Sequence, residues 1–135
     1  MTSDETHPYP GLVKIASEVQ RIIDDLPEGV SGAMDLCKHH VHMKLQGPKS
    51  PAFDVVLGGE APDIVYDSRF IERATIGSDI EEHFEFARET ASEIVDFILS
   101  GRKAIERKSR IFGRTYLHVP LSNGAEWKMK KFSAD

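Results

Sequence analysis

The chain has 135 residues, 40% of them hydrophobic, and this length fits one domain that buries about two-thirds of its unfolded surface. The single cysteine, Cys37, excludes an internal disulfide, and no apolar run approaches the roughly 20 residues of a membrane span. The polar, acidic N-terminus is also unlike a secretory leader. We therefore expect a cytoplasmic protein without membrane contact, in which a flexible tail over residues 1–10 precedes a single domain over residues 11–135.

The formal net charge of −5 is unevenly distributed along the chain. Residues 1–100 contain 19 acidic and 8 basic side chains, whereas residues 101–135 contain 3 and 9. Such a division can indicate a surface for a charged partner, self-association, or compensation between neighbouring elements. The overall acidity counts against nucleic-acid binding, because phosphates are usually recognised by basic domains.

The first amphipathic helix is predicted over residues 11–26. Its apolar side chains recur every three or four positions and therefore share one face, with Pro27 and Gly29 marking the end of the helix. The residues of this stripe are Leu12, Ile15, Ala16, Val19, Ile22, Ile23 and Leu26.

The next segments have the two-residue period of strands. Val41, Met43 and Leu45 alternate with His40, His42 and Lys44, which predicts a half-buried strand of about ten residues. Short apolar strands are predicted over 53–57, 64–66 and 70–76, with a tight turn at Asp67 and Ser68. Cys37 is interpreted as a small core residue.

The second helix is predicted over residues 79–100 and has marked ends. Ser78 and Glu81 have the spacing of a capping box, and Gly101 can adopt the left-handed conformation that stops a helix. Its buried stripe is predicted to contain Ile80, Phe84, Ala87, Ala91, Ile94 and Ile98, with Val95 and Phe97 widening it near the end.

The C-terminal segment is predicted to form a hairpin after an exposed or edge strand within 104–112. A three-residue loop with Gly124 in the left-handed conformation sets Val119 against Trp127 and Leu117 against Met129, which keeps the apolar side chains on one face. The opposite face would then be basic and aromatic, since it would carry Arg114, Tyr116, His118, Lys128 and Lys130.

These patterns favour an α+β fold, with a mostly antiparallel sheet and both helices, about 11–26 and 79–100, packed on one face. The functional prediction is a non-enzymatic protein-binding module without a cofactor, inhibitor-like or self-associating. Its candidate surfaces are the basic hairpin face and an acidic helix side with Glu85, Glu89 and Glu93 at four-residue steps.

Two alternative functions remain open. A metal-dependent or small-ligand enzyme could use His40 and His42, because imidazoles two residues apart on a strand can reach one zinc or iron ion. The missing third ligand would come from His118, His83, Asp54 or Asp63. The basic hairpin face could instead bind single-stranded nucleic acid, with Tyr116 or Phe132 stacking on a base.

Overall fold

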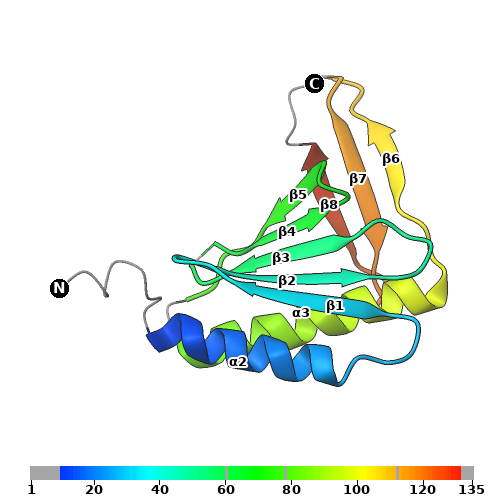
Figure 1. Ribbon diagram of the computed structural model, residues 1–135. Coiled ribbons are helices and arrows are strands. Elements are labelled where there is room, and N and C mark those ends of the chain that lie inside the picture. Colours follow the sequence, from blue (N-terminus) through cyan, green and yellow to red (C-terminus); the bar gives the residue numbers. More distant parts are fainter. Residues whose placement is uncertain (1–9, 60, 78, 112, 132–135) are drawn as a thin grey trace.

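The computed structural model describes residues 10–59, 61–77, 79–111 and 113–131 (Figure 1). Helix α2 spans Pro10–Asp24 and helix α3 spans Ile80–Ser100. The strands are β1 (Ser31–Leu36), β2 (Val41–Gln46), β3 (Phe53–Leu57), β4 (Asp63–Tyr66), β5 (Phe70–Arg73), β6 (Ile105–Lys108), β7 (Thr115–Pro120) and β8 (Glu126–Lys131).

All eight strands belong to one antiparallel sheet with the order β1-β2-β3-β4-β5-β8-β7-β6. The first five strands form one meander and the last three form another. The two meanders meet between β5 and β8, where Phe70 pairs with Lys131 and Ile71 with Lys130 among the residues that the structure describes. Figure 1 shows β6–β8 turned steeply away from the plane of β1–β3.

Helices α2 and α3 lie side by side on the same face of β1–β3 (Figure 1). The predicted α+β class, with a mostly antiparallel sheet and two amphipathic helices on one face, is confirmed. Neither described helix combines the length and the apolar character that a bilayer-spanning helix needs.

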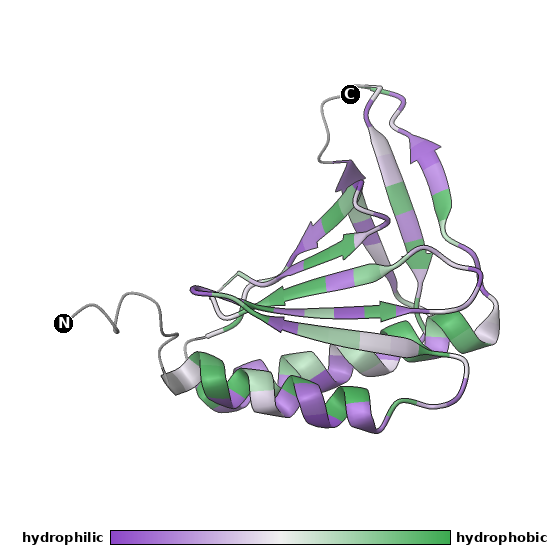
Figure 2. Cartoon of the chain, viewed as in Figure 1, coloured by the Kyte–Doolittle hydropathy of each residue, from purple (hydrophilic) through white to green (hydrophobic). Residues whose placement is uncertain are grey.

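Strict alternation along the strands builds the core. Val41, Met43 and Leu45 of β2 are fully buried, and the intervening side chains face away from the helices. The same alternation is visible along β7 in Figure 2. Phe53 of β3 is fully buried at the centre, where its ring lies 4.8 Å from Tyr66, 5.7 Å from Phe97 and 6.2 Å from Trp127, measured between ring centroids.

The predicted C-terminal end of α3 is confirmed, whereas the N-terminal cap differs from the predicted one. Gly101 has φ of 75°, the left-handed conformation expected of a helix-ending glycine. At the other end the N-cap is Asp79, whose carboxylate accepts a hydrogen bond from the Glu81 backbone nitrogen at 3.2 Å. The predicted capping residue, Ser78, lies outside the described residues.

The predicted half-buried strand around Val41 is confirmed as β2, but its length of about ten residues was wrong, because β2 has six residues and a second six-residue strand, β1, precedes it. β1 pairs with β2, and the Cys37 nitrogen donates to the His40 carbonyl at 2.8 Å across a tight turn. β1 has no β-branched residue to signal it, and its glycine lies against the side chains of Leu26 and Ile23. A Cβ on Gly32 would lie 2.7 Å from the Leu26 Cδ1 atom.

The predicted C-terminal register is confirmed. Val119 pairs with Trp127 and Leu117 with Met129, and Gly124 has φ of 88°. The segment within 104–112 contains β6, the last strand of the sheet, and all four of its residues are exposed. Figure 2 shows β6 as hydrophilic along most of its length, which agrees with the predicted edge strand.

Candidate metal centre

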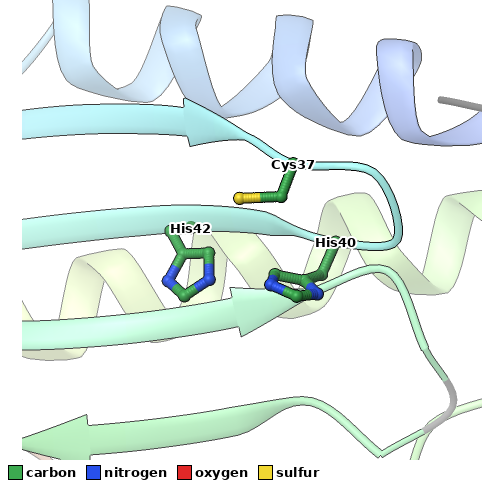
Figure 3. Close-up of side chains that lie close together, drawn as sticks. All are labelled: Cys37, His40 and His42. Atoms are coloured by element: carbon green, nitrogen blue, oxygen red, sulfur yellow. The ribbon is translucent and has the colours of Figure 1, made fainter. Parts of the chain in front are cut away.

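The turn between β1 and β2 brings together Cys37, His40 and His42 (Figure 3). Cys37 directly follows β1, His40 directly precedes β2, and His42 lies within β2. One potential ligand atom from each of the three lies within 4.8 Å of the other two, and the two imidazole rings are 4.7 Å apart between centroids. All three residues are partly buried.

At their upper limit of 4.8 Å, these separations are wider than those of an assembled tetrahedral metal site. Ligand atoms about 2.0–2.3 Å from zinc are about 3.3–3.6 Å from each other. The centre of a triangle with sides of 4.8 Å is about 2.8 Å from each corner, so side-chain movements of less than about 1 Å would complete three bonds. A backbone rearrangement is not required.

Asp54 of β3 orients one of the two imidazoles. Both of its carboxylate oxygens lie 3.2 Å from the Nδ1 atom of His42. Because an ionised carboxylate can only accept hydrogen bonds, Asp54 favours the tautomer of His42 in which Nδ1 carries the proton and Nε2 is left to bind a metal ion. Figure 3 shows one ring nitrogen of His42 on the side of Cys37 and His40.

The charges around Cys37 suit a cation. Partial burial raises the pKa of the Cys37 thiol, and the neighbouring Asp35 carboxylate, with an oxygen 3.7 Å from the sulfur, raises it further. The thiol is therefore protonated at neutral pH when no cation is bound. A divalent ion would favour the thiolate and would also be attracted by Asp35 and Asp54.

A pocket of about 240 Å³ lies beside this cluster on the sheet face that the helices do not cover. It is lined by His42 together with Ala33, Met34, Asp35, Lys44 and Asp54. An ion held by the three ligands would therefore have room for a water molecule or a small ligand next to it, with one ammonium group and two carboxylates nearby.

The third ligand was not among the residues expected from the sequence. Cys37 is partly buried and lies outside the hydrophobic core, so its interpretation as a core residue was wrong. The sequence does contain a pattern that indicates a three-ligand cluster, since Cys37 is followed by histidines three and five positions later. A tight turn at this spacing brings a strand end and the start of the next strand into contact.

Of the four expected third ligands, only Asp54 lies at the cluster. His83 is buried on α3, at 5% exposure, and its Nδ1 atom has no hydrogen-bond partner among the described residues. His118 on β7 is hydrogen-bonded to Glu126 at 3.1 Å. Asp63 on β4 accepts a hydrogen bond from Arg73 at 2.8 Å.

The basic hairpin face has the predicted composition but is partly engaged within the protein. Tyr116 pairs with Lys130 and His118 with Lys128, so these four side chains point to the same side of the sheet. The Lys128 ammonium lies 4.5 Å from the centre of the Tyr116 ring. A base could stack on that side of Tyr116 only if Lys128 moved.

The nucleic-acid prediction also involved Arg114 and Phe132. Arg114 is exposed and precedes β7, whereas Phe132 lies outside the described residues. Single-stranded nucleic-acid binding by the hairpin stays a prediction.

The three glutamates of the predicted acidic helix side differ in their surroundings. Glu85 and Glu89 are exposed on α3. Glu93 instead accepts hydrogen bonds from the backbone nitrogen of Ser122 at 3.1 Å and from its hydroxyl at 3.0 Å, which ties α3 to the turn between β7 and β8. Recognition of a basic partner therefore stays a prediction that rests on Glu85 and Glu89.

No family model matches the chain, and no curated protein or solved structure is significantly similar to it.

Proposed function

We propose that this protein binds one Zn²⁺ ion through Cys37, His40 and His42, and that the ion serves as a catalytic centre for metal-assisted hydrolysis. The observation that carries the proposal is the convergence of three ligand atoms within 4.8 Å at the turn between β1 and β2. This favours the metal-dependent enzyme over the protein-binding module that the charge pattern alone had suggested.

The ligand types favour zinc over the hard divalent ions. Thiolate and imidazole are ligands of zinc and other transition metals, whereas magnesium and calcium prefer oxygen. The hydrogen bond from His42 to Asp54 supports the same assignment, because a ligating histidine usually donates its second ring N–H to a carboxylate or carbonyl.

The number of ligands favours a catalytic ion over a structural one. Structural zinc sites are usually closed by four protein ligands, while catalytic sites have three and leave a position for water. The adjacent pocket, which is lined by His42 of the three ligands, would give a water molecule or substrate room beside the ion. Zinc lowers the pKa of bound water towards neutrality and so generates a nucleophile, while Lys44 in the same pocket could attract an anionic substrate.

The metal is tested with untagged protein loaded with Co²⁺ in place of Zn²⁺. We expect one ion per chain and a sulfur-to-cobalt charge-transfer band that is absent in Cys37→Ser and strongly reduced in His40→Gln. His39→Gln is the matched control, because His39 is adjacent in sequence but lies outside the cluster. A ratio far below one ion per chain, or a band unchanged in Cys37→Ser, would overturn the site.

Asp54 and the open position are tested on the same Co²⁺ protein. Asp54→Asn should weaken metal binding by about 10–100-fold, the usual effect of losing a carboxylate that orients a ligating histidine. Added azide should change the visible spectrum if a coordination position is free. An unchanged spectrum at saturating azide would show a closed site and contradict the catalytic part of the proposal.

A further inference from the structure

A second pocket, of about 470 Å³, lies at the C-terminal end of α3. Its walls come from the turn between β2 and β3 and from the connection between α3 and β6, and β4 contributes Tyr66. This volume lies within the range of about 300–1,000 Å³ that is usual for small-molecule sites. The metal cluster shares no residue with it.

The inner part of this pocket is apolar and rigid. Phe97 and Ile98 of α3 line it together with Tyr66. Phe97 is buried at 4% exposure, and both Phe97 and Tyr66 pack against the fully buried ring of Phe53. An apolar ligand group entering the pocket would therefore contact the edge of the main core.

The β2–β3 wall is held in place before any ligand binds. The Gly47 nitrogen donates to the Ser50 hydroxyl at 3.3 Å, and the Gln46 side chain donates to the Ser50 carbonyl at 3.2 Å. Gly47 is also pressed against α3, since a Cβ on it would lie 2.6 Å from the Ile98 Cγ2 atom. A preformed wall lowers the entropic cost of binding.

The opposite wall is fixed at the end of α3. The Ser100 hydroxyl donates to the Phe97 carbonyl at 3.0 Å and accepts from the Arg102 nitrogen at 3.2 Å. The Arg102 guanidinium forms an ion pair with Asp96 and also donates to the Pro120 carbonyl at 3.4 Å. Its charge is thus largely compensated within the protein.

Two other cations of the pocket lack such compensation. Neither Lys49 nor Lys103, which both line it, has an ion-pair or hydrogen-bond partner in the described part of the chain, and no described lining residue is acidic. The Tyr66 hydroxyl likewise makes no hydrogen bond among these residues. Burial raises the pKa of Tyr66, so this hydroxyl stays protonated and can donate.

We infer that this pocket binds a small organic anion, an aromatic carboxylate, with its ring against Phe97, Ile98 and Tyr66 and its carboxylate at Lys49 and Lys103. The apolar interior favours an anion that carries a ring over a bare inorganic anion, which would leave that interior unfilled. The unpaired ammonium groups favour an acid over a neutral aromatic compound, because a carboxylate would complete charge-assisted hydrogen bonds with them.

The test is an amide NMR titration of the full chain with 2-naphthoate and with its neutral analogue 2-naphthalenemethanol. EDTA is present throughout, so that the carboxylate cannot bind through a metal ion. We expect saturable shifts at Tyr66, Phe97 and Ile98 with 2-naphthoate, and at least tenfold weaker binding of the alcohol to the same wild-type protein. Shifts confined to other regions, or equal affinity for both compounds, would overturn the inference.

Two variants test the residues directly. Lys49→Ala/Lys103→Ala should weaken 2-naphthoate binding at least tenfold, whereas Lys14→Ala/Lys108→Ala, which removes two exposed lysines outside the pocket, should change it by less than twofold. Tyr66→Phe retains the ring and should lose about two- to tenfold, the range for one hydrogen bond. Equal binding by the two lysine pairs would refute the assigned anion contacts.

Discussion

Phe53 is the residue whose replacement should most weaken the connection between the two meanders. Its ring contacts Tyr66 of β4, Phe97 of α3 and Trp127 of β8, all within 6.2 Å between centroids. Truncation of a buried phenylalanine to alanine costs about 3–5 kcal/mol, and each aromatic pair contributes about 0.5–1.5 kcal/mol beyond its buried area. We therefore expect Phe53→Ala to lose about 4 kcal/mol of unfolding free energy and Phe53→Leu about 2 kcal/mol.

Urea denaturation followed by Trp127 fluorescence measures both losses. Since small domains are stable by only about 5–15 kcal/mol, Phe53→Leu is the variant that should remain folded enough for a full curve. Phe84→Leu is the matched control, because Phe84 is only partly buried and its ring faces the Arg88 guanidinium at 6.0 Å. It should lose less than about 1 kcal/mol. Equal losses for Phe53→Leu and Phe84→Leu would refute the central role of Phe53.

Three further substitutions test electrostatic and backbone features. The hydrogen bond from Arg88 to Glu18, at 2.7 Å, lowers the pKa of Glu18, so its stabilisation is present above the ordinary value of 4.5 and is lost as the pH falls. Arg88→Ala should therefore lower the thermal midpoint at pH 7, and the difference from wild type should vanish as the pH falls. Burial raises the pKa of Glu72, so its ionised form is unfavourable in the folded state. Glu72→Gln should therefore raise the thermal midpoint at pH 7. This gain should shrink as the pH is lowered through the folded-state pKa of Glu72. Gly101→Ala should lower the urea midpoint by the equivalent of about 1 kcal/mol. The cost is conformational, because φ is 75° at this position and an added Cβ would meet no other atom within 4 Å. An unchanged midpoint would contradict that conformational cost.

The parts of the fold that could be predicted from sequence depend on local periodicity. Along α3, the predicted stripe residues Ala87, Ala91 and Ile94 are buried, whereas Ile80, Phe84 and Ile98 are only partly buried. The periodicity did not indicate that His83 and Thr90 are buried as well. In the C-terminal hairpin a shift of one residue would have exposed Val119 and Leu117, so the apolar pattern selected one register.

The parts that escaped prediction depend on contacts between distant segments. β1 has little strand propensity of its own and is held by β2 on one side and by α2 above Gly32. Because β1 was missed, the turn after it was missed as well, and Cys37 could not be placed beside the two histidines. The pocket at the end of α3 could not be anticipated either, since residues 47–51, residue 66 and residues 97–104 meet only in the folded chain.

The short pairing between β5 and β8 has a consequence for how the protein unfolds. The two residue pairs described there supply few backbone hydrogen bonds, so separating the meanders would leave most of the described sheet ladders intact. Cooperativity between the halves must then come mainly from side chains, above all Phe53 with Trp127 and Glu93 with Ser122. The backbone forms a continuous sheet, but we expect these side-chain contacts to decide whether β6–β8 unfolds together with the rest of the protein or opens separately.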